Sequence, residues 1–134
     1  MIGVVCKGNA EAFEFCAAFA EWCHWIDDCI DKDHLCLPET AIRVNLRAFL
    51  AFSSNAFFQR HKECLTPLIV QAFRSYADSN GWEKRMDVRD RRAADVLKGY
   101  YHEVLWHTAY LAGGWEHLAF ITKKYRSYDY DCKE

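Results

Sequence analysis

The chain has 134 residues, of which 51% are hydrophobic, 16% aromatic and 27% charged, and its formal net charge is −2. This length fits one domain with a core of its own, and the composition excludes a disordered chain. Two prolines and six glycines are too few for a turn-rich all-β fold. The nearly neutral charge does not favour nucleic acid as a partner, and no apolar run is long enough to cross a membrane.

The cysteines bear on the cellular compartment. There are seven of them, an odd number, and no two form a C-x-x-C pair. Disulfide frameworks and structural zinc sites normally show paired spacings, so the pattern argues against both. The segment before the first predicted helix is also too short for the apolar region of a signal peptide. We therefore expect a soluble protein of the reducing cytoplasm.

Apolar residues recur at helical spacing along nearly the whole chain, which predicts an all-α fold. Asn9 is the predicted N-cap of a first helix that runs to about Lys32. Its core-facing stripe consists of Phe15, Phe19, Trp22, Ile26 and Ile30. Pro38 opens a second helix, which Ser53-Ser54-Asn55 interrupts. The apolar face of this second helix consists of Ile42, Leu46, Phe49 and Leu50.

Three further helices are predicted in the second half of the chain. Thr66-Pro67 has the pattern of an N-cap followed by the first helical residue, and Gly81 ends that helix. A fourth helix runs from about Asp90 to Ala112 and is ended by Gly113-Gly114. A fifth helix runs from Trp115 to about Tyr125. The sequence thus predicts a compact bundle of about five helices in a single domain, residues 1–134.

The end of the first predicted helix carries a cluster of aspartates, Asp27, Asp28 and Asp31, on the side opposite the apolar stripe. Like charges at these spacings repel, and the negative end of the helix dipole disfavours them further. A divalent cation with oxygen ligands, Mg2+ or Mn2+, would offset this repulsion. We therefore interpret the three aspartates as candidate metal ligands. The alternative is a solvated acidic face.

Two polar residues, Glu103 and His107, stand one turn apart on the fourth predicted helix, which is otherwise apolar nearly all round. A carboxylate in that setting needs a partner. That partner is either His107 or an arginine, or else both residues complete a site with the aspartates across the bundle. In such a site Glu103 would be a further ligand or a general base, and His107 a ligand or proton carrier.

A basic segment precedes the fourth predicted helix, with arginines and lysines interspersed among acidic residues. Mixed signs at these spacings are typical of a solvated helix start that pairs with itself. Alternatively, one or two of the arginines face the aspartates and hold the phosphate of a phosphorylated small molecule.

Asp27-Asp28-x-x-Asp31 resembles the first aspartate-rich motif of isoprenoid synthases, in which such aspartates hold Mg2+ against a substrate diphosphate. The resemblance covers only these five residues, and the chain lacks the second aspartate-rich motif of that family.

A longer resemblance is to small all-α proteins encoded by phages and prophages. It rests on the motif Trp25-x-Asp27-Asp28-x-x-Asp31-x-Asp33, on the segment from Phe57-Phe58 to Pro67, and on the region from Leu97 to Glu116. This resemblance implies a viral or prophage context and no particular reaction.

Two functional hypotheses follow from these features. In the first, the chain binds a divalent cation through the aspartates, and the ion engages a phosphorylated ligand and supports its hydrolysis by activating water. In the second, the chain is a non-catalytic protein-interaction module or a structural homo-oligomer such as a homodimer. The aspartate face would then contact a basic partner, and aromatic side chains would form the subunit interface.

Overall fold

The computed structural model describes residues 1–31 and 37–126, and within these ranges it is helical and contains no strand. The all-α bundle predicted from the sequence is therefore confirmed. The elements are α1 (Ile2–Val5), α2 (Ala10–Asp31), α3 (Pro38–Ser54), α4 (Ala56–Trp82), α5 (Val88–Lys98), the 3-10 helix η1 (Gly99–Tyr101) and α6 (His102–Tyr125). In the described part of the chain, no helix is both long enough and apolar enough to span a membrane.

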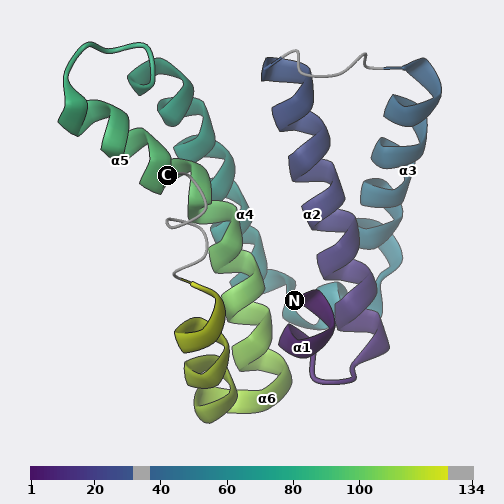
Figure 1. Ribbon diagram of the computed structural model, residues 1–134. Helices are drawn as coiled ribbons and strands as arrows, with labels where there is room; N and C mark the ends of the chain where they lie inside the picture. The colour runs from purple at the N-terminus through teal and green to yellow at the C-terminus, as the bar shows by residue number, and fades with distance from the viewer. Residues whose placement is uncertain (32–36, 127–134) are drawn as a thin grey trace.

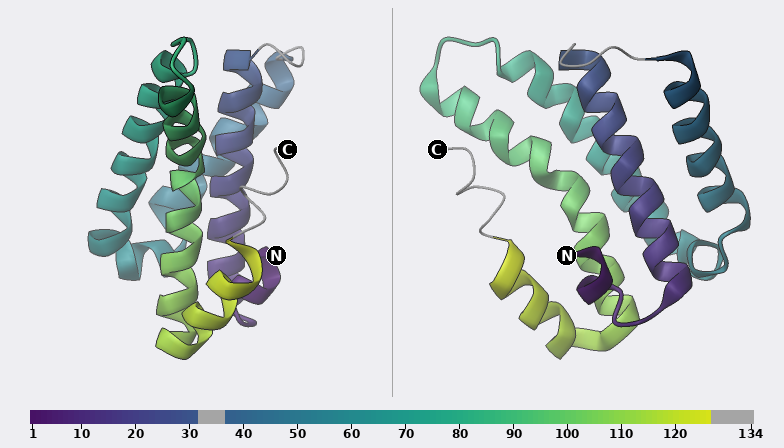
Figure 2. Two further views of the ribbon diagram at one scale, coloured as in Figure 1. Left: turned by 60° about the vertical axis from the view of Figure 1, so that its left-hand side comes forward. Right: turned by 45° about the vertical axis from the view of Figure 1, so that its right-hand side comes forward.

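The helices form two parts of one bundle (Figure 1). Helices α2 and α3 lie side by side, and α4 and α6 form the other part of the bundle. Helix α5 folds back along the end of α4, and α1 packs against α6 (Figure 2). The last part of α6 reverses direction and returns beside the first part.

A cluster of aromatic rings holds α2 to α3 and α4. Phe15 of α2 is fully buried at its centre. Its ring centroid lies 6.0 Å from that of Phe52 of α3 and 5.3 Å from that of Phe58 of α4. Trp22 extends the cluster along α2 by edge-to-face contact with Phe73 at 5.1 Å. Such pairs stabilise a core beyond the area they bury, so much of the high aromatic content serves the fold itself.

Asparagine side chains cap the N-termini of α2 and α4, and the cap of α2 is predicted from the sequence. Asn9 Oδ1 accepts a hydrogen bond from the Ala12 amide at 3.0 Å, which confirms the predicted N-cap of α2. Asn55 separates α3 from α4, and its Oδ1 accepts from the Phe58 amide at 2.9 Å. The predicted interruption at Ser53-Ser54-Asn55 is therefore confirmed, with the chain turning at a single residue.

The prediction that Thr66-Pro67 begins a helix is wrong. Pro67 lies inside α4, which continues through it to Trp82. An internal proline removes one backbone hydrogen bond and costs about 3 kcal/mol in an isolated helix. Here Leu65 and Ile69 are buried on either side of it, and Pro67 itself is exposed. Packing of the flanking turns therefore keeps the helix continuous.

The prediction of one helix from about Asp90 to Ala112 is also wrong in part, because this range is divided between α5 and α6. Helix α5 begins at Val88 behind the cap Asp87, whose side chain accepts from the Arg89 amide. The helix ends at Lys98, and η1 follows before α6 begins. Gly99 has a low helix propensity, and a 3-10 turn at this point lets the chain change direction between α5 and α6.

The turn within α6 depends on two glycines. Gly114 has φ 84° and ψ −173°, a backbone conformation essentially restricted to glycine. A Cβ added at Gly113 would lie 2.6 Å from the ring of His117. The predicted break at Gly113-Gly114 is thus present, and it folds the second arm of α6 (residues 115–125) back along the first (residues 102–112).

The glycine turn leads to a stability prediction. We expect Gly114→Ala to lower the free energy of unfolding by about 1–3 kcal/mol, because alanine must adopt the glycine-only conformation. The matched control is Gly81→Ala, which lies within α4 with open space around its Cβ position and should stabilise by about 0.5–1 kcal/mol. Thermal and urea unfolding measure both variants. Equal effects of the two substitutions would contradict the prediction.

Candidate functional site

The aspartate-rich end of α2 faces α4 and the end of α5. The Tyr76 hydroxyl of α4 donates a hydrogen bond to Asp27 Oδ1, and both residues are half-buried. Burial, this hydrogen bond and the charges of Asp27 and Asp31 all raise the pKa of the Tyr76 phenol. The hydroxyl therefore stays protonated and continues to donate.

Lys98, the last residue of α5, brings a positive charge to the same place. Its amine pairs with the carboxylate of Glu83 and lies 6.0 Å from the centroid of the Tyr76 ring. Burial lowers the pKa of this amine, but the hydrogen bond to Glu83 and the nearby aspartate charges outweigh burial and raise it. We call this group the Lys98 cluster: Asp27, Asp31, Tyr76, Glu83 and Lys98. A lysine of the chain therefore supplies part of the positive charge that the aspartates require.

The predicted metal ligands can now be placed. Asp27 and Asp31 belong to the Lys98 cluster, while Asp28 is half-buried and makes no hydrogen bond or ion pair within residues 1–31 and 37–126. In those same ranges, no group of three or more histidine, cysteine, aspartate or glutamate side chains is placed to hold a metal ion. Asp33 lies outside the described residues. A metal site at Asp27, Asp28 and Asp31 stays a prediction.

Glu103 and His107 have partners of their own on α6. Glu103 Oε1 accepts a hydrogen bond from Arg126 Nη2 at 2.7 Å, an ion pair that joins the two arms of α6. Of the partners expected from the sequence, an arginine is thus the one present. The His107 ring is half-buried, with its centroid 5.8 Å from that of Tyr110. Within residues 1–31 and 37–126, neither residue has a hydrogen bond, ion pair or ring contact with the Lys98 cluster, and their catalytic roles stay predictions.

A cavity of about 380 Å3 lies between the arms of α6, and Glu103 and His107 both line it. Its apolar wall includes Trp106, Trp115 and Leu118. Such a volume is at the lower end of the range of small-molecule sites, roughly 300–1,000 Å3. The sequence singled out the two polar residues, but it gave no sign that the chain after Gly114 returns to enclose them.

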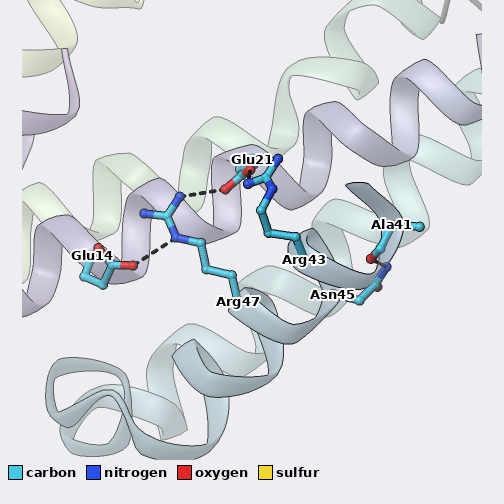
Figure 3. Close-up of polar contacts among 6 residues, drawn as sticks. All are labelled: Glu14, Glu21, Ala41, Arg43, Asn45 and Arg47. Atoms are coloured by element: carbon cyan, nitrogen blue, oxygen red, sulfur yellow. Dashed lines mark hydrogen bonds and ion pairs between the residues drawn. The ribbon is translucent and has the colours of Figure 1, made fainter. Parts of the chain in front are cut away.

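Ion pairs fix how α3 lies on α2 (Figure 3). Arg47 bonds both Glu14, at 2.9 Å, and Glu21, at 2.6 Å, and Arg43 bonds Glu21 at 2.5 Å. The two arginines hold the pKa of Glu21 below its usual range by hydrogen bonds from Arg47 and Arg43. We call these four residues the α2–α3 clamp. Beside it, small α3 residues such as Val44 and Ala48 are buried.

The apolar face of α3 is consequently turned away from the bundle. The exposed fractions are 69% for Ile42, 55% for Leu46, 65% for Phe49 and 49% for Leu50. At 100° per residue, this apolar face lies opposite the buried side of the helix. The sequence identified these four residues as an apolar face, which a helix of a globular protein ordinarily buries. A signal was available in Arg43 and Arg47, which lie between the apolar face and the buried small residues and mark that flank of α3 as a polar contact surface.

The cysteines differ in part from the expectation. In the described residues, Cys6, Cys16, Cys23 and Cys64 are free thiols. Cys29, however, is disulfide-bonded. The odd count and irregular spacing therefore did not exclude a disulfide, although they argued against a framework of several.

Comparison with protein-family models, with curated proteins and with solved structures finds no match to this chain. The site must therefore be interpreted from its own chemistry.

The Lys98 cluster makes the metal hypothesis testable. Because Lys98 already faces Asp27 and Asp31, we expect about 5 mM Mg2+ or Mn2+ to leave the Tm of the parent protein unchanged. In Lys98→Met, the unbalanced carboxylates should lower the Tm, and the same ions should restore part of it. Differential scanning fluorimetry measures both effects, with exposed Lys84→Met as the control. A metal-dependent rise in the parent that Asp28→Asn or Asp31→Asn abolishes would instead favour the divalent-cation hypothesis.

The α2–α3 clamp leads to a pH prediction. A carboxyl whose pKa is lower in the folded state stabilises the fold above its unfolded value, here 4.5, and this contribution is lost as the pH falls through the folded value. We expect Glu21→Gln to destabilise by roughly 0.5–1 kcal/mol at neutral pH. The difference from the parent should shrink towards zero by about pH 3.

Thermal unfolding followed by circular dichroism at several pH values measures this difference. Glu63→Gln, on the exposed side of α4, is the control and should differ little from the parent at any pH. A Glu21→Gln difference that grows as the pH falls would contradict the assigned ion pairs.

Proposed function

We propose that this protein is a non-catalytic interaction module that forms a homodimer through the exposed face of α3. The observation that carries the proposal is the exposure of Ile42, Leu46 and Phe49, each more than half exposed, on one side of one helix. Together with Leu50 they expose on the order of 500 Å2, which is the size of the largest apolar patch on a typical monomeric protein, and such patches are often functional.

The residue spacing on this face favours a second copy of the chain as the occupant. Glu39, Ile42, Leu46, Phe49 and Ser53 follow one another at steps of three and four, the repeat of helices that pair side by side. The three central residues are apolar and the two outer ones polar, so the order is the same in both directions about Leu46. Two antiparallel copies of α3 related by a two-fold axis would therefore place apolar on apolar residues.

The size and the charge of the face agree with this arrangement. A standard interface takes about 800 Å2 from each partner, and the patch would supply the larger part of it. Arg43, which borders the patch, is paired with Glu21 of its own chain. Two copies would therefore meet without unpaired like charges across the axis, and we expect a dimer of micromolar rather than nanomolar affinity.

Sedimentation velocity over about 1–100 μM tests this proposal, since that range spans a micromolar Kd. We expect the parent to shift from monomer to dimer and Leu46→Asp to remain monomeric. Because Leu46 is exposed, the Tm of the variant should stay close to that of the dilute parent. The matched control is Val70→Asp, which places the same charge on an exposed valine of α4 and should still dimerise.

Two outcomes would overturn the proposal. If the parent stays monomeric at the highest concentration, the face does not bind a second copy. If Leu46→Asp and a second variant, Phe49→Ser, dimerise like the parent, self-association uses another surface.

A further inference from the structure

The cavity between the arms of α6 is apolar on its walls and charged where it opens. Trp106 is buried at its inner side, while Trp115 is 70% exposed and contributes a free indole surface. Leu68 of α4 and Leu118 of the second arm complete the apolar lining. This hollow exists because the glycine turn brings the two arms together, and it uses no residue of the α3 face.

The charged lining residues leave an excess of positive charge. Lys123 and Arg126 line the cavity and are exposed, so they lie where it meets solvent. Glu103 is the one carboxylate among the described residues of the lining, and it pairs with a single guanidinium nitrogen of Arg126, Nη2. Lys123 has no ion-pair partner within residues 1–31 and 37–126. An incoming anion would therefore find the Lys123 amine, which no carboxylate of the described residues pairs, and the remaining N–H groups of Arg126.

We infer that this cavity binds a small amphipathic anion. Its flat apolar body would lie against Trp115 and Leu118, and its head group, a carboxylate or a phosphate monoester, would bond Lys123 and Arg126. Charge-assisted bonds of this kind are the stronger class of hydrogen bond, and an exposed indole is a favourable surface for an aromatic ring. A volume of about 380 Å3 admits one ring with a short side chain and excludes a dinucleotide.

Glu103 limits the affinity of this site. Its carboxylate competes with the ligand head group for Arg126 and repels it at short range. Removal of the charge in Glu103→Gln should therefore strengthen anion binding, although it weakens the tie between the two arms of α6. If Glu103 served only to hold the two arms together, Glu103→Gln would instead weaken anion binding, because the arms would loosen.

The test uses 4-phenylbutyrate as the probe and 4-phenylbutanol as its uncharged counterpart. Indole N–H signals of Trp106 and Trp115 are followed by 15N NMR while each compound is added to about 10 mM, which detects Kd values up to the millimolar range. We expect both signals to shift with 4-phenylbutyrate and the alcohol to bind at least about fivefold more weakly. A parallel titration with phenethyl phosphate determines which head group the site prefers.

Neighbouring residues of the second arm provide matched controls. Lys124 does not line the cavity and lies instead over the rings of Phe120 and Tyr125, 5.8 and 5.4 Å from their centroids. We expect Lys123→Gln to weaken binding about fivefold and Lys124→Gln, the same change in net charge, to leave it unchanged. Likewise, Trp115→Ala should abolish binding and exposed Phe120→Ala should not.

The inference is overturned if neither indole signal shifts, if the alcohol binds as well as the acid, or if the two lysine variants weaken binding equally. The first outcome shows that the cavity is closed to such molecules. The other two show adsorption of the phenyl group or a general charge effect. Leu46→Asp, which tests dimerisation, should not alter this binding, so the two proposals fail independently.

Discussion

The orientation of α3 about its own axis, which decides the side that faces α2, is the constraint on which the surface of this protein depends. Two arginines, one helical turn apart, reach across to the same glutamate of α2, and a helix held in this way can present only one side to its neighbour. Small side chains fill that contact, so α3 approaches α2 closely without using its large apolar residues. Each exposed ion pair is weak by itself, but together with the close packing they select one orientation.

The aromatic cluster explains why the bundle tolerates this arrangement. Rings from α2 and α4, with Phe52 as the large contribution of α3, form a core that does not need the outer residues of α3. Aromatic residues of this chain thus serve two separate purposes, one in the core and one on the exposed face of α3. The cavity of α6 is a third purpose: Trp106 belongs to the core and also lines the cavity, while the exposed Trp115 belongs neither to the core nor to the α3 face.

Much of the helical architecture could be predicted from the sequence, because the signals concerned are local. Asn9, Asn55 and Gly114 act through their own backbone or a hydrogen bond three residues away, and the sequence predicts the cap at Asn9 and the breaks at Asn55 and Gly114. The helix start predicted at Pro67 is wrong because the effect of this proline depends on how Leu65 and Ile69 pack, which is a tertiary property. Periodicity found the apolar face of α3 correctly, but periodicity carries no information on which face of a helix its neighbour covers.

The candidate site shows the same limit. The repulsion among the aspartates was a sound inference, yet Lys98 stands about seventy residues away and no spacing rule connects the two. Likewise, the sequence predicts that Glu103 needs a partner, with an arginine as one of the alternatives. That the partner is Arg126 follows only from the reversal of the chain at Gly114.

One residue ties the beginning of the chain to that reversal. His117 lies over Gly113, and its Nε2 donates to the carbonyl of Val5 at 3.0 Å. A four-residue helix such as α1 has no stability of its own, so α1 persists only while it remains attached to α6. The two segments should therefore open and close as one cooperative unit, with similar hydrogen-exchange protection despite the 112 positions that separate the bonded residues. Fluctuations of α1 would then reach the cavity, because His117 lies on the second arm of α6, which also carries Lys123 at the cavity mouth.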